Sequence, residues 1–211
     1  MKRKEKSKLQ IQTSKPTQKD GSQPILHQPG HEIQQFGTLR NLPLALGTIA
    51  REESCEQLNQ ILADSMILYS LHKKHHWLMR GNTFYQLHLL LDKHAGEQLE
   101  LIDLIGERVQ TLGGVAIAVG VASALRNPRH VAEVTTIERP PNGVEEVPVM
   151  LSRLLEAHES ILREVREGIT SSAANHDEST SDLLTSDVLR TNKSQVWFLA
   201  EHLVDTPLVR S

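Results

Sequence analysis

The sequence is poor in the residues that crosslink small secreted proteins or anchor proteins in membranes. Cys55 is the single cysteine among 211 residues, which excludes a framework of disulfides within the chain. Aromatic residues make up 3% of the sequence, and no apolar run reaches the ~18 residues of a membrane-spanning helix. Lys2-Arg3-Lys4 precedes polar residues and not an apolar segment, so no secretory signal is predicted. These absences indicate a cytoplasmic protein without a membrane segment.

Strand signals are also weak, whereas apolar residues recur at helical spacing in four segments. The spacing predicts long helices over residues 51–76 and 83–112, a third from residue 147 and a fourth within 179–203. A short helix is expected near 118–125, before a linker at 139–143 that contains two adjacent prolines and Asn-Gly. Four helices with polar residues facing inward predict an all-α four-helix bundle.

The ends of the chain differ in kind from its middle. Residues 1–45 are rich in Lys, Gln, Ser, Thr and Pro, and are expected to form a flexible basic tail before a bundle over 46–205 and a short C-terminal tail over 206–211. The first twenty residues carry net +5, which leaves −8 for the rest because the whole chain carries −3. The basic residues are Lys2, Arg3, Lys4, Lys6, Lys8, Lys15 and Lys19. Such a tail can bind DNA without sequence preference, or serve only as a solubilising extension.

Four side chains that can bind metal lie on the predicted second helix as two i,i+4 pairs. His88 and Asp92 form one pair, and Asp103 and Glu107 form the other. The two pairs share a face to within ~60°, but fifteen residues of helix separate them by ~22 Å. Metal–ligand bonds are about 2.0–2.6 Å long, so one chain offers two half-sites. Antiparallel pairing of two chains about a two-fold axis near Gln98 would complete two equivalent sites.

A fifth candidate ligand, His76, ends the predicted first helix. The turn at Arg80-Gly81-Asn82 is expected to fold it back towards His88. Two imidazoles and three carboxylates suit iron, manganese or zinc better than calcium or magnesium, which prefer oxygen ligands throughout. The alternative reading is a solvated acidic face beside an interfacial histidine, because acidic side chains on helices are mostly exposed.

The same residues carry a family resemblance. Residues 75–84 read HHWLMRGNTF, and Leu87-His88 and Asp92 follow. The pattern D-x-x-x-E-R then begins at Asp103, and L-G-G begins at Leu112. Over roughly residues 45–205, this pattern resembles that of the Dps proteins, the DNA-binding mini-ferritins of starved bacteria.

The resemblance implies a ferritin-like bundle, with a short helix in the long connection between the second and third helices, that assembles into a hollow dodecamer. It further implies a ferroxidase centre of two irons, with His76, His88 and Asp92 from one subunit and Asp103 and Glu107 from its partner. Iron(II) would be oxidised there, generally by hydrogen peroxide, and stored as iron(III) in a cytoplasmic, nucleoid-associated protein that protects DNA. A nucleoid-packing protein with a structural metal site, and a zinc or manganese buffer, remain alternatives.

Several further positions are expected to support such a protein. Trp77 beside the site is either a packing anchor or a quencher of radicals. His27, His31 and Glu32 form either a second metal site, as in some long-tailed members of the family, or an exposed loop. Five acidic residues are candidates for lining an iron pore at a three-fold axis. These are Glu145, Glu146, Glu156, Glu159 and Glu164. A Glu-x-x-His pattern, typical of ferritin-like sites inside the bundle, is absent from the sequence.

Overall fold

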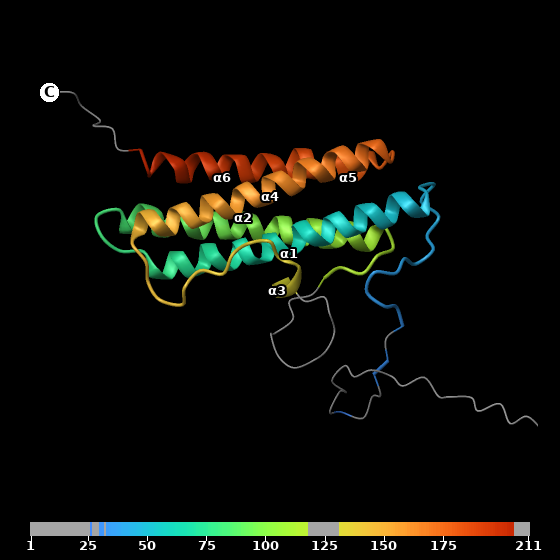
Figure 1. The fold of residues 1–211 in the computed structure, drawn as a ribbon, viewed down its shortest axis with the longest axis horizontal. Helices are drawn as coiled ribbons and strands as arrows, with labels where there is room; N and C mark the ends of the chain where they lie inside the picture. Colours follow the sequence, from blue (N-terminus) through green and yellow to red (C-terminus); the bar gives the residue numbers. More distant parts are fainter. Residues whose placement is uncertain (1–25, 27–29, 32, 118–130, 205–211) are drawn as a thin grey trace, which may run out of the picture.

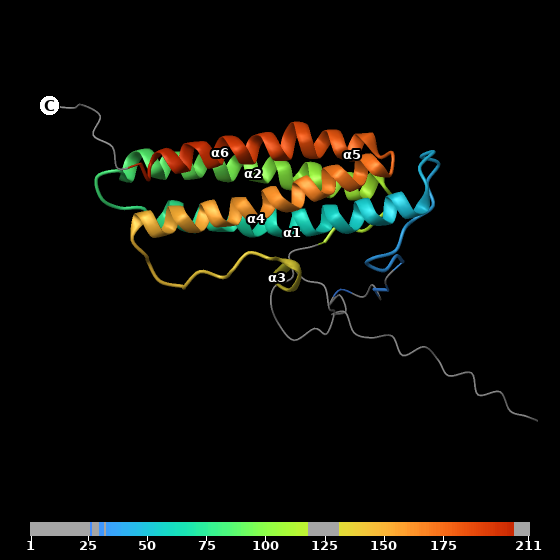
Figure 2. The same ribbon diagram turned by 45° about the horizontal axis from the view of Figure 1, so that its top comes forward.

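The computed structural model describes residues 26, 30–31, 33–117 and 131–204, and within these ranges every regular element is a helix. Helices α1 (Thr48–Leu78), α2 (Phe84–Thr111) and α4 (Val147–Ala174) are long. The fourth segment runs continuously through α5 (Glu178–Leu183), the π-helix η1 (Leu184–Leu189) and α6 (Arg190–Glu201). All four segments lie side by side in both views (Figures 1 and 2), which confirms the predicted all-α bundle.

The predicted helix boundaries agree with the observed ones to within about three residues at most ends. The π-helical turn within the fourth segment was not predicted, because it depends on packing and not on apolar spacing. The short helix expected near 118–125 lies outside the described residues, and a four-residue helix, α3 (Val131–Val134), follows later in the same connection. In the described ranges, no helix combines the length and apolar character needed to cross a bilayer.

The core is made of aliphatic side chains from all four helical segments. Fully buried examples are Leu58 and Leu62 on α1, Leu91 and Ile105 on α2, Leu154 and Ile161 on α4, and Leu184 on η1. Burying each such side chain contributes roughly 1.5–3 kcal/mol relative to exposure. The apolar side chains that recur at helical spacing therefore face the interior of the bundle. Leu104 on α2 has the same spacing but is 40% exposed.

A segment ahead of the predicted boundary at residue 46 is attached to the end of α2. The Arg40 amide donates to the Gly113 carbonyl at 2.7 Å, and the Gln34 side chain donates to the same oxygen at 2.9 Å. Gly113 has φ +88°, and a Cβ added there would lie 2.5 Å from the Arg40 carbonyl oxygen. Only glycine fits this backbone conformation and this close approach.

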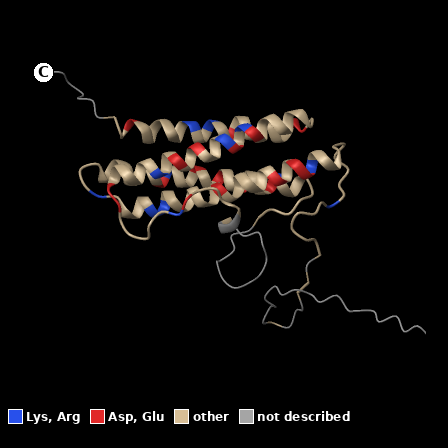
Figure 3. Ribbon diagram, viewed as in Figure 1, with Lys and Arg blue, Asp and Glu red and all other residues tan. Residues whose placement is uncertain are grey.

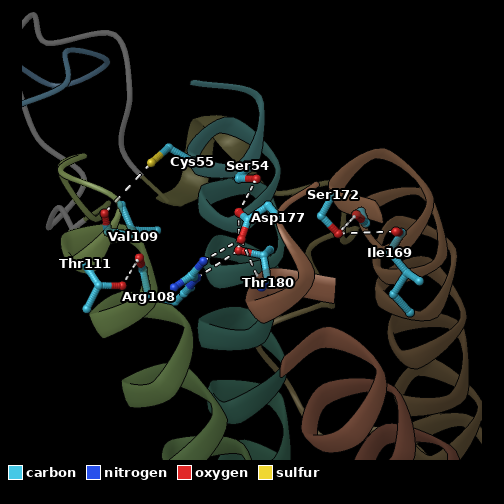
Figure 4. Close-up of polar contacts among 10 residues, drawn as sticks. Ser54, Cys55, Arg108, Val109, Thr111, Ile169, Ser172, Asp177 and Thr180 are labelled. Carbon is cyan, nitrogen blue, oxygen red and sulfur yellow. Dashed lines mark hydrogen bonds and ion pairs between the residues drawn. The ribbon is translucent and has the colours of Figure 1, made fainter. Parts of the chain in front are cut away.

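A polar network around Asp177 joins three helical segments at one end of the bundle (Figure 4). Asp177 caps α5 by accepting from the Thr180 amide and hydroxyl, and it also accepts from Ser54 at 2.8 Å and from Arg108 at 2.5 Å. Burial alone would raise the pKa of Asp177, but hydrogen bonds from Thr180 and Ser54 and the charge of Arg108 lower it below its ordinary value. The folded structure therefore stabilises the ionised form of Asp177.

A second buried carboxyl group fixes the connection that carries α3. Asp64 on α1 accepts hydrogen bonds from the Thr135 hydroxyl and from the Thr136 amide at 2.9 Å. Glu164 on α4 lies beside it, sharing the Thr136 hydroxyl, which lies 3.0 Å from an oxygen of each carboxyl group. Burial, and then the neighbouring Asp64, raise the pKa of Glu164 to about 8. Glu164 therefore keeps its proton in neutral solution.

We expect Asp177→Ala to lower stability by about 3 kcal/mol, because it leaves the Arg108 charge without its partner and uncaps α5. The midpoint of thermal unfolding at pH 7 should fall by roughly 5–10 °C. The difference should shrink as the pH falls through the lowered pKa of Asp177, where the carboxylate is lost in the parent protein as well. Glu159→Gln is the control, because the exposed Glu159–Arg163 pair at 3.6 Å should matter little. Equal effects of the two substitutions would contradict the role of Asp177.

Glu164→Gln should flatten the dependence of stability on pH. The folded chain keeps the Glu164 proton up to about pH 8, whereas the unfolded chain releases it near the ordinary value of about 4.3. Stability therefore decreases as the pH rises between these values, and glutamine removes that decrease. The measurement is the unfolding midpoint from pH 5 to 9, with Glu167→Gln on the same helix as the control. A profile of Glu164→Gln that parallels the parent protein would refute the raised pKa of Glu164.

Candidate metal centre

His76 and His88 are brought together by the turn between α1 and α2, as the sequence predicts. Gly81 takes φ +84° in this turn, a conformation that glycine adopts without steric cost. The two imidazoles stack with ring centroids 3.7 Å apart and an interplanar angle of 21°. Phe84, at the start of α2, lies against the His88 ring at 5.1 Å.

The backbone selects the nitrogen that each ring can offer to a ligand. Nδ1 of His76 lies 2.7 Å from the carbonyl oxygen of His88, and Nδ1 of His88 lies 3.0 Å from the carbonyl oxygen of His76. Because a carbonyl oxygen can only accept, each Nδ1 carries the hydrogen and each Nε2 keeps a lone pair. This is the arrangement that usually supports metal-binding histidines.

Asp92, the third predicted ligand of this half-site, is instead paired with Lys73. Its Oδ1 lies 2.6 Å from the Lys73 Nζ. The hydrogen bond and charge of Lys73 lower the pKa of Asp92, and His76 and His88 lower it further. Asp92 is therefore an anion beside the histidine pair, but within the described ranges no three His, Cys, Asp or Glu side chains form a ready metal site. The pairing with Lys73 was missed because the two residues lie on different helices.

Asp103 and Glu107 lie farther along α2, on its exposed surface. Both line a shallow groove with Ile102, Gly106 and Gln110, and with residues of α1 and the segment after α2. The rise of the helix places these carboxylates ~22 Å from the histidine pair. One chain therefore keeps the two half-sites apart, as the sequence predicts.

Large apolar side chains remain exposed on the same helix. Tyr85, Leu89 and Leu99 are each about half to two-thirds exposed, and Trp77 at the end of α1 is 70% exposed. The Gln98 side chain, near which the predicted two-fold axis passes, points into the bundle and is fully buried. Exposed apolar side chains near two half-sites are typical of a surface that a partner protein covers.

The other predicted positions are placed only in part. His31 is exposed, while His27, Glu32 and the basic residues of the tail lie outside the described residues. Acidic and basic positions are interspersed along the helices (Figure 3). Of the pore candidates, Glu145 is paired with Arg153 at 2.7 Å and Glu164 turns towards Asp64. These contacts compensate part of the acidic charge on and near α4.

Three comparisons with known proteins place the chain in a family. The model of the ferritin-like domain matches residues 55–209. The solved structure of DpsC from Streptomyces coelicolor is 62% identical, with a TM-score of 0.79, and the match covers 85% of this chain and 100% of that one. A protein of Kitasatospora aureofaciens is 58% identical over 71% of this chain and 94% of its own length.

A more distant relative carries a functional name. The DNA protection during starvation protein of Agrobacterium fabrum is 30% identical over 69% of this chain and 85% of its own length. The predicted resemblance is thereby confirmed, since bundle, motif spacing and relatives agree. The chain belongs to the Dps family of ferritin-like proteins.

Proposed function

We propose that this protein oxidises iron(II) at sites shared between two subunits and stores the iron(III) in a hollow dodecamer. The observation that carries the proposal is the histidine pair, whose Nδ1 atoms are bound to carbonyl oxygens while both Nε2 atoms remain available. Asp103 and Glu107 cannot reach that pair within one chain. An antiparallel partner would supply them.

The proposed centre has a ligand set suited to the reaction. His76, His88 and Asp92 of one subunit, with Asp103 and Glu107 of the other, would hold two irons. Carboxylate oxygens are hard ligands that favour iron(III), whereas the imidazoles also bind iron(II). With hydrogen peroxide as oxidant, two iron(II) ions each give one electron, the O–O bond breaks, and the two oxygens take up two protons to leave as water.

Lys73 has a defined part in this proposal. It neutralises Asp92 when no metal is bound, and a bound cation would take over that carboxylate. Trp77, exposed in the single chain, would be covered by the partner and serve as a packing anchor beside the centre. When the substrate iron binds, it would therefore replace the Lys73 ammonium as the cation beside Asp92.

The shared site predicts complementation between two inactive variants. His88→Ala and Asp103→Ala should each abolish rapid formation of the iron(III) absorbance after anaerobic iron(II) loading and peroxide addition. When the two variants are co-assembled, each mixed dimer regains one intact site, because one chain supplies His88 and the other supplies Asp103. About a quarter of the parent activity should return for random pairing in two-fold dimers.

Both controls use the same oxidation assay. Co-assembly of His88→Ala with Asp92→Ala should restore nothing, since both substitutions damage the same half-site. A site contained within one chain would give no recovery in either mixture, and that outcome would overturn the inter-subunit arrangement. Unchanged rates in both single variants would overturn the proposed ligands.

DNA binding through the basic tail is the second part of the proposal. The first twenty residues carry net +5, and the Agrobacterium relative is named for DNA protection. Repeated over an oligomer, such tails would neutralise many phosphates and place the protein on the nucleoid. A nucleoid-packing role with a structural metal, or zinc or manganese buffering, would leave oxidation absent in the assay above.

Removal of residues 1–20 should abolish the gel shift of DNA at moderate salt. A matched full-length variant with glutamine at the seven basic tail positions should behave in the same way, because the interaction is electrostatic. For the parent protein, the logarithm of the binding constant should fall linearly with the logarithm of salt, by about 0.9 per phosphate neutralised. Equal binding by all three proteins would refute the assignment to the tail.

A further inference from the structure

Three fully buried histidines lie together inside the bundle, about one helical turn from the half-site that contains His76. His72 comes from α1, His94 from α2 and His158 from α4. The ring centroids of His72 and His94 are 5.4 Å apart, and those of His72 and His158 are 5.5 Å apart. His72 is therefore the shared member of the cluster.

The fourth helical segment adds buried polar side chains to this histidine cluster. Asn192 and Gln195 of α6 are buried with Gln98 of α2. Gln98 Nε2 lies 3.1 Å from Asn192 Oδ1 and 3.0 Å from Gln195 Oε1. The π-helical turn η1 ends just before α6, and Asn192 Nδ2 donates to the Val188 carbonyl there at 2.8 Å. All four helical segments therefore contribute polar side chains to one connected cluster inside the bundle.

These amides fix the tautomer of His158. Because Asn192 Nδ2 donates to Val188, its Oδ1 is the acceptor that lies 2.9 Å from His158 Nδ1. His158 Nδ1 therefore carries the hydrogen, and Nε2 presents a bare lone pair. This is a histidine oriented by a neighbouring hydrogen bond in the way that metal ligands usually are.

Several buried polar atoms of the cluster lack hydrogen-bond partners. In the part of the chain that the structure describes, no hydrogen bond reaches His158 Nε2, either ring nitrogen of His72 or His94, or Gln98 Oε1. Burial lowers the pKa of His72 well below its ordinary range and that of His158 to about 3. Neutral imidazole is the form that binds metal ions.

The distances from the His72 ring to the other two rings suit a single ion. With Zn–N bonds of about 2.0–2.1 Å, each ring centroid lies about 3.2 Å from the metal, so neighbouring centroids are about 5.2–5.5 Å apart. The two measured separations fall within or close to this range. In the described ranges no three ligand side chains already converge on one point, so binding must turn His94 and His158 towards His72.

We propose that the bundle interior binds one divalent transition-metal ion of the imidazole-preferring class, with His72, His94 and His158 as ligands. Zn²⁺ represents this class, because the set holds three imidazole nitrogens and no carboxylate. Gln195 Nε2 donates to the Glu97 carboxylate at 2.8 Å, which brings a negative charge into the surrounding network. This site is separate from the proposed iron centre.

The test uses the full-length oligomer with the inter-subunit ligands removed by His88→Ala and Asp103→Ala. After Zn²⁺ loading and desalting, metal analysis should find about one ion more per chain in this background than after adding His72→Leu or His158→Leu. His75→Leu is the matched control, because His75 is also buried on α1 with neither ring nitrogen paired among the described residues. That control should keep the ion.

Thermal unfolding gives an independent readout on the same proteins. Excess Zn²⁺ should raise the unfolding midpoint of the background and of the His75→Leu control by about 5 °C or more, and should not raise that of the two cluster variants to the same extent. Equal zinc content in the background and in both cluster variants would overturn the proposal. Because every protein in this series already lacks His88 and Asp103, the result is independent of iron oxidation.

Should a cluster variant fail to assemble, the background protein without a cluster substitution decides the question. A Zn²⁺-soaked crystal of the background protein should show an anomalous density peak between His72, His94 and His158. A peak confined to other positions, or none, would overturn the interior site.

Discussion

The distance that an α-helix rises per residue is the constraint on which the proposed chemistry depends. Fifteen residues of α2 span ~22 Å, and a metal–ligand bond spans about 2 Å. A rigid helix therefore cannot bring Asp103 and Glu107 to the histidine pair of its own chain. The exposed apolar side chains beside these half-sites supply the hydrophobic area that an antiparallel partner would bury. In the proposed assembly, association and site formation are one event.

The bundle holds its histidines in two different ways. At the turn between α1 and α2, backbone carbonyls orient His76 and His88 through Nδ1, which leaves a lone pair on each Nε2. In the interior, the side chain of Asn192 orients His158, and solvent is excluded. His72 and His76 are one helical turn apart on α1, ~6 Å along its axis. The two proposed metal sites would therefore adjoin along one helix.

Local patterns predicted most of the fold and part of the site. Apolar spacing gave the four helical segments, and the glycine at position 81 indicated the turn that joins His76 to His88. Contacts between distant segments were not accessible in this way. The network of Ser54, Arg108 and Asp177 joins positions more than fifty residues apart. The π-turn and the histidine cluster likewise depend on how each helix is rotated about its axis, which spacing along one helix does not fix.

The pair of Lys73 and Asp92 bears on when the proposed shell can form. Three carboxylates per centre would repel one another across an empty interface, and an ammonium beside Asp92 offsets part of that repulsion. Subunits would therefore join without waiting for metal. Metal-free shells could then be present before the concentrations of iron and peroxide increase. Lys73 would bind Asp92 until the first metal ion displaces it.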